Sequence, residues 1–414
     1  MRTLVIGLGK SGLAAMELLQ EEGDIVVGHD ENAQLLKQLA EKGIVVSATP
    51  IVKKFDRIVV SPGVPPQNPF YAEGVRLGKE VIGEAELALS RLQASRQCAA
   101  ITGSNGKTTV TLLTQHVLQK SGKKAQALGN VGSPLASYVK DSDPNEIMVV
   151  ELSSFQLETM KTAVFNVGII LNITPNHLNR HASMEEYAGA KCHLQELIKP
   201  TGSFWVHEAV KRDFGHFLSL PYQTYGESIE EFLKIGYTTG GKHDLENAQA
   251  AWILCRSFGV SAQEFVEALR TFKKPPHRIE FVASWDGIDF FNDSKSSNID
   301  STIKAVETMK TPVVLIVGGV DKGSSYEPWK KVFEGRVKKV VAIGEAAPKI
   351  AAELKPEFEV EIASSLEAAV NTAEQSAQSG ECVLLSPGCS SYDMFENYAQ
   401  RGDVFKNFVL RRER

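Results

Sequence analysis

The sequence has few cysteines, no long apolar run and no excess of basic residues. Its 414 residues include five cysteines, which are dispersed without the close pairs of metal-ligand motifs. That usage indicates reduced thiols in a cytosol rather than a disulfide framework. No apolar stretch approaches the ~20 residues that a membrane span requires, and Lys10 interrupts the apolar start too early for a signal peptide. We therefore expect a cytoplasmic protein with no membrane partner.

The charge balance gives no support for a nucleic-acid partner. Lys and Arg number 45 against 50 Asp and Glu, a formal net charge of −5, whereas nucleic-acid-binding domains usually carry a basic excess. With 43% hydrophobic and 23% charged residues, the composition is that of a globular enzyme. The length is too great for one ordinary domain. We expect two or three domains in a chain that acts as a monomer.

Short apolar runs alternate with helix-length polar stretches along the chain, with no low-complexity tract or short repeat. This alternation predicts βαβ units around parallel sheets. The expected fold class is α/β, with three domains in series. These are a Rossmann-like N-terminal domain (1–93), a central P-loop ATPase-like domain (94–274) and a C-terminal Rossmann-like domain (275–414). The Pro275–Pro276 pair marks the last boundary because it cannot continue a helix.

The first of two glycine-rich turns has the spacing of a dinucleotide-binding turn. Gly7-x-Gly9-x-x-Gly12 follows an apolar run and precedes a helix-like segment at 13–22. The three glycines of such a turn allow the tight bend, the approach of a phosphate and the packing of helix on strand. Asp30 ends the next apolar run, where a ribose hydroxyl is often held. Taken alone, this turn favours a nicotinamide or flavin oxidoreductase.

A second turn, "TGSNGKTT" (102–109), follows the strand-like "CAAI" and precedes a helix-like segment at 110–122. Gly103 and Gly106 let backbone N–H groups turn toward phosphates, Lys107 can reach the terminal phosphates, and Thr108 offers a hydroxyl to Mg²⁺. The usual pattern has a glycine where Ile101 stands. An ordinary strand–turn–helix with a capping hydroxyl is the alternative, but Gly-Lys-Thr-Thr after a buried strand favours ATP binding.

Two further apolar runs end in polar residues that could do chemistry. Glu151 follows "IMVV", where a carboxylate is costly unless it is paired or metal-bound. It could hold Mg²⁺, or it could be a helix-capping acid. His177 lies just past "VGIILNI", and one loop histidine is usually a satisfied or exposed side chain. Spacing alone leaves Lys191 as an ordinary surface lysine.

In their order along the chain, these motifs resemble the Mur ligase family, the ATP-dependent amide-forming enzymes of peptidoglycan precursor synthesis. The shared motifs are "TGSNGKTT", "ELSSFQLE", "LNITPNHLNRH" with a lysine fourteen residues after its His177, "HRIE" and "NDSKSSN". Within the family, "IGLGKSG", "SPGVPP" and "LLSPGCSSYDMFENYAQRGDVF" are similar to the branch that adds D-glutamate to UDP-N-acetylmuramoyl-L-alanine. The His-His-Pro of alanine-adding members and the Asp-Asn-Pro-Arg of diaminopimelate-adding members are absent.

The resemblance implies that one loop binds the UDP of a substrate and the other binds ATP. It also implies two Mg²⁺ sites, a carbamylated Lys191 and an acyl-phosphate intermediate. The implied catalytic residues are Lys107, His177, Lys191, Arg278 and Lys295. The implied ATP-binding residues are Gly103, Ser104, Asn105, Gly106, Lys107, Thr108, Thr109, His243, Asn247, Arg278 and Asp293.

The implied substrate and metal sites complete the set. The residues that the resemblance implies for UDP-substrate binding are Gly9, Lys10, Ser11, Asp30, Glu31, Asn32, Asn130, Ser153 and Gln156. D-Glutamate binding falls to Ser297, Lys322, Ser391 and Tyr398. Metal binding falls to Thr108, Glu151, His177 and the carbamate of Lys191.

The sequence departs from the family pattern at three of these places, and other functions stay open. Asn176 and Asn179 stand where the family often has aspartate, which removes negative charge near the second metal, and Tyr398 stands where phenylalanine is expected. Another Mur-type or a folylpolyglutamate-type amide ligase is one alternative. An NAD-linked oxidoreductase and a non-catalytic nucleotide-binding regulator are alternatives from other classes, and the first turn could be a vestigial fold element.

Overall fold

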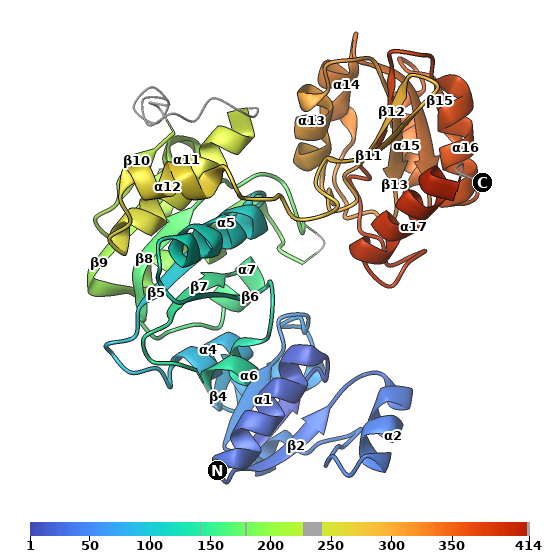
Figure 1. Ribbon diagram of the computed structural model, residues 1–414. Helices are drawn as coiled ribbons and strands as arrows, with labels where there is room; N and C mark the ends of the chain where they lie inside the picture. Colours follow the sequence, from blue (N-terminus) through green and yellow to red (C-terminus); the bar gives the residue numbers. More distant parts are fainter. Residues whose placement is uncertain (141, 179, 227–241, 412–414) are drawn as a thin grey trace. The chain divides into compact units, whose positions relative to one another are not determined.

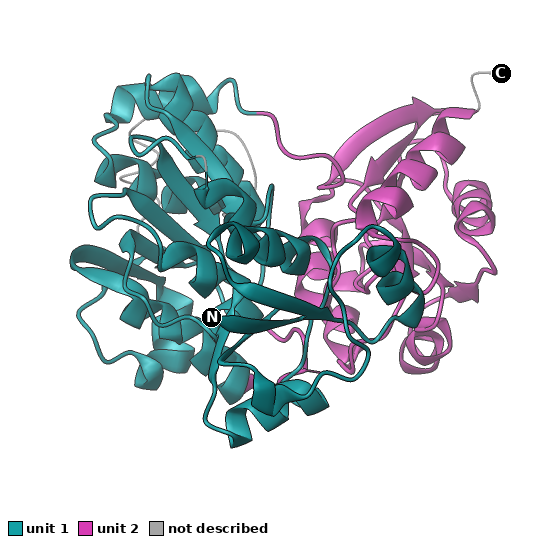
Figure 2. Ribbon diagram, turned by 90° about the horizontal axis from the view of Figure 1, so that it is seen from below, with its two compact units in different colours: residues 1–173, 185–272 teal, residues 174–184, 273–414 magenta. Residues whose placement is uncertain are grey.

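The computed structural model describes the chain except residues 141, 179, 227–241 and 412–414 (Figure 1). The described residues form three sheets, each accompanied by helices. They divide into two compact units, residues 1–173 with 185–272 and residues 174–184 with 273–414 (Figure 2). The first unit holds two of the sheets and the second holds the third. This confirms the expected α/β class and its three-domain architecture.

The N-terminal sheet has four parallel strands in the order β2-β1-β3-β4. The chain therefore leaves β1 toward β2 and later returns to its other side at β3, which creates a switch point where ligands of open α/β sheets bind. The elements are β1 (Arg2–Ile6), α1 (Lys10–Glu21), β2 (Ile25–His29), α2 (Ala33–Glu41), η1 (Val52–Lys54), β3 (Arg57–Val60), α3 (Pro69–Arg76), β4 (Glu80–Gly83) and α4 (Glu84–Leu89).

The first glycine-rich turn folds as its spacing predicts. Gly7 has φ +86°, a conformation that favours glycine. A Cβ atom on Gly12 would lie 1.8 Å from the Gly7 carbonyl oxygen, so only glycine lets α1 approach the strand this closely. A Cβ atom on Gly9 would have no atom within 4 Å. The side of the turn at Gly9 is therefore open to a ligand.

The central sheet has six parallel strands in the order β10-β9-β8-β5-β7-β6. Helices α5, α11 and α12 bury apolar side chains in one core with β5, β7 and β8. The elements are β5 (Cys98–Thr102), α5 (Lys107–Lys120), β6 (Ala125–Gly129), α6 (Leu135–Val139), β7 (Ile147–Glu151), α7 (Ser154–Leu157), β8 (Phe165–Ile170), α8 (Met184–Cys192), η2 (His193–Leu197), β9 (Ile198–His207), α9 (Glu208–Phe214), η3 (Gly215–Phe217), β10 (Gln223–Tyr225), α11 (Lys242–Ser257) and α12 (Ala262–Leu269).

The C-terminal sheet is mixed, in the order β11-β12-β16-β13-β14-β15 with only the β11–β12 pair antiparallel among its described strands. Because β12, β16 and β13 are adjacent and parallel, the loops after them emerge at one edge. The elements are β11 (Glu280–Trp285), β12 (Ile288–Asn292), α13 (Ile299–Thr308), β13 (Val313–Gly318), α14 (Glu327–Phe333), β14 (Val337–Ile343), α15 (Ala347–Leu354), β15 (Val360–Ile362), α16 (Leu366–Ser376), β16 (Cys382–Leu385) and α17 (Tyr398–Leu410).

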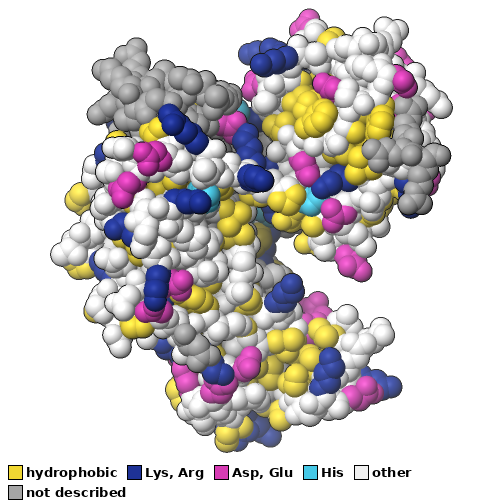
Figure 3. Space-filling view, viewed as in Figure 1, with side chains coloured by type: hydrophobic (Ala, Val, Ile, Leu, Met, Phe, Trp, Pro, Cys, Tyr) yellow, Lys and Arg dark blue, Asp and Glu magenta, His cyan; other side chains and the backbone are white. Residues whose placement is uncertain are grey.

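Cysteine and surface features agree with the composition. All five cysteines are buried free thiols, so no disulfide stabilises the fold. No helix in the described part of the chain combines the length and apolarity of a membrane span. On the face drawn in Figure 3, basic and acidic side chains are interspersed on both units.

The two glycines of the first turn make a matched test of the close packing between α1 and β1. Gly12→Ala should lower the free energy of unfolding by about 1–3 kcal/mol, because a clash with backbone outweighs alanine's helix preference of ~1 kcal/mol. Gly9→Ala should leave stability unchanged, because its Cβ meets nothing. Denaturant unfolding of both variants checks this, and equal stability losses would contradict the packing role assigned to Gly12.

Candidate active site

A cavity of about 560 Å³ opens at the carboxyl ends of β1, β2 and β3, within the first unit. Its wall includes Ser61 to Pro65 of the proline-rich loop after β3, and Gly129 and Pro134 of the central domain. Seven of the nine residues expected at the UDP substrate line it: Gly9, Lys10, Ser11, Asp30, Glu31, Asn130 and Gln156. The cavity thus lies at the switch point of the N-terminal sheet.

Several polar side chains near the cavity are bonded to backbone. Asp30 accepts the Leu8 N–H at 2.7 Å and the Asn32 N–H at 2.9 Å, so its carboxylate holds the glycine-rich turn in place. The remaining two expected residues are absent from the wall. Asn32 caps α2, and Ser153 caps α7 in a reciprocal pair with Gln156. These caps fix the elements that carry the cavity.

The second glycine-rich turn leads from β5 into α5 with the conformation expected of a phosphate-binding loop. Gly103 has φ +150° and Gly106 has φ +85°, and Thr108 and Thr109 lie in the first turn of α5. The Nζ of Lys107 folds back to donate to Gly103 O at 2.7 Å and Ser104 O at 3.1 Å. Helix α5 begins at residue 107, three residues before the expected segment, because the loop leads directly into it.

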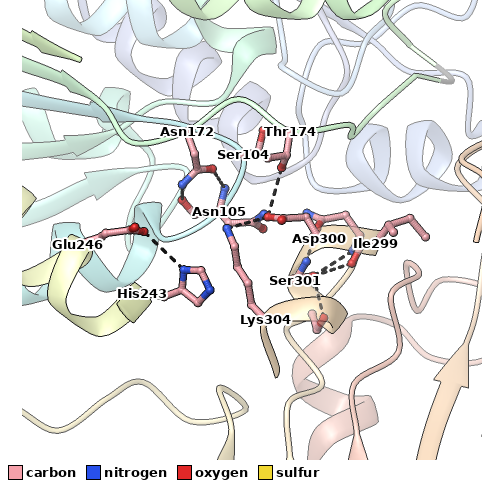
Figure 4. A network of polar contacts seen from close by, with 12 residues as sticks. Ser104, Asn105, Asn172, Thr174, His243, Glu246, Ile299, Asp300, Ser301 and Lys304 are labelled. Carbon is pink, nitrogen blue, oxygen red and sulfur yellow. Dashed lines mark hydrogen bonds and ion pairs between the residues drawn. The ribbon is translucent and has the colours of Figure 1, made fainter. Parts of the chain in front are cut away.

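Asn247 and Asn172 brace this loop from two sides. A Cβ atom on Gly106 would lie 2.4 Å from Asn247 Oδ1, so the amide packs against the loop. Asn172, just past β8, accepts the Asn105 N–H at 2.8 Å and donates to Asn105 O at 3.1 Å (Figure 4). The sequence reasoning missed Asn172, although it stands in the quoted "LNITPNH" motif.

Glu151 ends β7 and is 1% exposed. Its Oε1 accepts a hydrogen bond from the side-chain amide of Asn130 at 2.8 Å, but its buried Oε2 has no hydrogen-bond partner among the residues that the structure describes. A buried carboxylate oxygen without a donor is costly, and a cation removes that cost. No three His, Cys, Asp or Glu side chains of the described chain converge on one point. A metal here would therefore need other donors besides Glu151.

Lys191 on α8 is 1% exposed and is not the surface lysine that spacing alone suggested. Its Nζ donates to Gly103 O at 3.0 Å and lies 4.6 Å from the ring centroid of Tyr187. Burial and the nearby charge of Lys107 hold the pKa of Lys191 well below its usual range. Tyr187, which the sequence reasoning missed, shares a hydrogen bond of 3.0 Å between its hydroxyl and Ser104 Oγ.

The two histidines expected at the site fall in different units. His243 on α11 has its Nδ1 3.4 Å from Glu246 Oε2 (Figure 4). His177 belongs to the segment 174–184 of the second unit and has φ +55°. Its N–H donates to Asn176 Oδ1 at 3.0 Å, so this amide shapes the turn at the histidine. Asn179 lies outside the described residues.

In the second unit, Asp293 follows β12 and anchors the segment that carries Arg278. It accepts Ser386 Oγ at 2.8 Å and the Ile279 N–H at 3.2 Å. Burial raises the pKa of Asp293 to about 7, although the positive charge of Arg278 lowers that pKa in part. Residues 277 and 279 both have positive φ, +63° and +50°. Arg278 therefore lies in a strained segment that Asp293 holds from one side.

The remaining expected residues lie in loops at one edge of the third sheet, except Tyr398, which begins α17. Lys295 Nζ is 3.8 Å from the ring centroid of Tyr398, a cation–π contact. Lys322 Nζ donates to Ser297 O at 2.9 Å. Ser391 is buried in the loop after β16. Adjacent parallel strands thus bring the loops of Ser297, Lys322 and Ser391 to one edge, and the start of α17 at Tyr398 is joined to the first of these loops by the hydrogen bond from Ser294 Oγ to Tyr398 O.

Comparison with known proteins is consistent with this arrangement. Three family profiles match in order: the Mur ligase MurD-like N-terminal domain over residues 1–83, the Mur ligase middle domain over 101–215 and the Mur ligase glutamate ligase domain over 277–389. A UDP-N-acetylmuramoylalanine–D-glutamate ligase of Protochlamydia amoebophila is 44% identical over 434 residues, 99% of this chain and 97% of that protein. The chain belongs to the Mur ligase family. An enzyme of the same name from Caldicellulosiruptor bescii is 39% identical over 98% of this chain and 96% of its own.

Solved structures of this Mur ligase's relatives share its fold. UDP-N-acetylmuramate–alanine ligase MurC of Thermotoga maritima has a TM-score of 0.60 at 18% identity, over 100% of this chain and 99% of that one. MurF ligase of Thermotoga maritima, solved in complex with ADP, has a TM-score of 0.58 at 15% identity, over 87% and 97% of the two chains. Family membership implies use of ATP with Mg²⁺.

Removal of the Asn172 side chain should weaken nucleotide binding. Asn172→Ala removes the two hydrogen bonds that Asn172 makes to the backbone N–H and C=O of Asn105, and we expect the Kd for ATP to rise about tenfold, as a loss of ~1.4 kcal/mol would give. Calorimetric titration with ATP measures this.

A matched control is Asn166→Ala, because Asn166 on β8 accepts the Cys98 N–H at 2.9 Å at the opposite end of β5. That variant should lose stability but keep the Kd for ATP. Equal affinities for Asn172→Ala and the native protein would refute the bracing role.

Proposed function

We propose that this Mur ligase adds D-glutamate to UDP-N-acetylmuramoyl-L-alanine, with ATP consumed through an acyl phosphate. Relatives that carry this enzyme's name are 36–44% identical over nearly the whole chain. The observation that carries the proposal is the presence of two phosphate-binding turns in one unit, one at the cavity and one at β5. Two nucleotides, the UDP of the substrate and ATP, account for two turns.

The position of Asn130 indicates that the substrate would extend from the cavity toward the ATP loop. Its side chain both lines the cavity and donates to Glu151 Oε1 at 2.8 Å. With the diphosphate at Gly9, Lys10 and Ser11, the muramoyl-alanine end would run past Asn130 toward Glu151. This direction brings the alanyl carboxylate to the residues that handle the phosphate of ATP.

Lys107 would assist transfer of the γ-phosphate to that carboxylate. Its ammonium bonds to loop carbonyls, which it would exchange for phosphate oxygens once ATP binds. Phosphoryl transfer depends on positioning and on cations that offset the developing charge. Arg278 and Lys295 of the second unit would add charge of the same sign.

The donor chemistry at the loop suits Mg²⁺, because one buried carboxylate oxygen of Glu151 lacks a hydrogen-bond partner among the described residues. Thr108, Glu151 and a carbamate on Lys191 in the first unit, with His177 supplied by the second unit, would hold two ions, and the ions would offset negative charge on the phosphates. Lys191 supports a carbamate because burial favours its neutral amine, and only the neutral amine adds CO₂. The amine nitrogen bonds to the carbon of CO₂ and releases a proton, which turns the neutral buried amine into an anion.

The second half-reaction needs a site for an acidic amino acid. The amine of D-glutamate, once deprotonated, attacks the acyl carbon, and phosphate leaves from the tetrahedral intermediate. Lys322, Ser297, Ser391 and Tyr398 offer a cation and polar groups for two carboxylates. We place the reaction in the cytoplasm, where both nucleotides are available.

We also propose that the domains span 1–93, 94–274 and 275–414 and that one chain is the active species. The three matched family segments fall within those spans.

Phosphate release from Mg-ATP with UDP-N-acetylmuramoyl-L-alanine tests the proposal. D-Glutamate, L-glutamate, L-alanine and diaminopimelate are added separately, and the amide product is followed by mass spectrometry. We expect release only with the UDP substrate and D-glutamate together, in step with the amide. Turnover with a different amino acid, or ATP binding without turnover for any of the four, would refute the substrate assignment.

A further inference from the structure

A buried arginine on α17 joins three loops of the second unit. Arg401 is 1% exposed. Its Nε–H donates to Ser294 Oγ at 3.0 Å, and Nη2 donates to Ser294 O at 2.8 Å. Both terminal nitrogens donate to Cys389 O at 3.2 Å, and Nη1 also lies 3.4 Å from Gly318 O. The five contacts correspond to the five N–H groups of a guanidinium.

The oxygens that Arg401 contacts are a hydroxyl and backbone carbonyls. None of these acceptors in the described chain is a carboxylate, and Asp293 and Asp393 act on the guanidinium only at longer range. Burial of a cation without an anionic partner is costly. The planar guanidinium of arginine can hold several acceptor groups in fixed positions at once, and the single ammonium group of lysine cannot. The arrangement therefore indicates that geometry, rather than ion pairing, accounts for the arginine.

The three loops are those expected to receive the incoming amino acid. Ser294 follows β12, three residues before Ser297. Gly318 ends β13, four residues before Lys322. Cys389 lies in the loop after β16, two residues before Ser391. Arg401 thus bonds to each loop within four residues of a side chain assigned to D-glutamate.

Close packing couples these loops to one another. Val320 N–H donates to Ser390 O at 2.9 Å, and a Cβ atom on Gly319 would lie 2.1 Å from that oxygen and 3.2 Å from Arg401 Nη1. Ser294 Oγ also donates to Tyr398 O at 2.8 Å, at the start of α17. A displaced guanidinium would therefore shift all three loops and the tyrosine.

We propose that Arg401 is the positioning residue for the incoming amino acid, because it fixes Ser297, Lys322 and Ser391 at the spacing that two carboxylates require. It acts through the backbone of the loops and does not touch the substrate. The inference rests on the proposed D-glutamate ligation and adds a residue that sets affinity for that one substrate.

Steady-state kinetics of Arg401→Met test the inference. We expect the KM for D-glutamate to rise about tenfold or more. That is the factor expected when the displaced loops lose one charge-assisted hydrogen bond to a carboxylate of D-glutamate. The KM for the UDP substrate should stay at the native value, because its cavity lies in the other unit. Arg401→Lys keeps the charge but not the fork, so it should restore only part of the affinity for D-glutamate.

Two further variants separate positioning from stability. Val409→Ala, on the same helix and 2% exposed, should lower the melting temperature without raising the KM for D-glutamate. Ser294→Ala keeps the arginine and removes one acceptor, so it should raise that KM less than Arg401→Met does. It also tests the inference if Arg401→Met does not fold.

The outcomes distinguish this inference from the proposed function. Native protein that shows no D-glutamate-dependent phosphate release refutes the function itself. Native activity with an unchanged KM for D-glutamate in both Arg401→Met and Ser294→Ala overturns only the role of Arg401. An equal rise in the KM for the UDP substrate would show a general structural role and would also overturn it.

Discussion

The burial of two ionisable side chains beside the phosphate-binding loop is the constraint on which the active site depends. Glu151 on β7 pairs in register with Ile101 on β5, and Ile101 lies two residues before Gly103. Lys191 approaches the same stretch from α8 and bonds to Gly103 O. A buried carboxylate and a buried amine cost stability unless a ligand completes them. Strands β5 and β7 and helix α8 hold the two buried groups beside the loop. The ligand that binds these groups then determines the chemistry of the site.

Polar side chains hold the loops that carry the proposed catalytic groups. Asn172 braces the loop after β5, and Asp30 braces the first turn through the Leu8 N–H. In the second unit, Asp293 holds the segment of Arg278. The first two bonds each join a side chain at the end of one strand to the backbone after another strand, whereas Asp293, just past β12, bonds to the backbone just before β11. Parallel sheets therefore place the loops, and amide and carboxylate groups fix their conformation.

The sequence predicts most of the fold and the residue types of the site, because strand-ending motifs are local. Glycine spacing predicts both turns. The positive φ values of Gly7 and Gly106 confirm that these turns need a backbone conformation that favours glycine. The sequence does not predict the burial of side chains whose surroundings come from distant parts of the chain. Lys191 reads as a surface residue until α8 is packed, and Tyr187 and Asn172 gain their roles only from neighbours distant in the chain.

We propose that the buried amine of Lys191 becomes an anion that would bind metal together with Glu151. Carbon-13 NMR in ¹³C-bicarbonate tests it directly, with Lys191→Met and, as the control, Lys199→Met, since Lys199 bonds to backbone carbonyls at Ala94 and Arg96. The account predicts a protein-bound carbamate resonance that Lys191→Met abolishes and Lys199→Met preserves. No such resonance in the native protein, or one that survives in Lys191→Met, would contradict it.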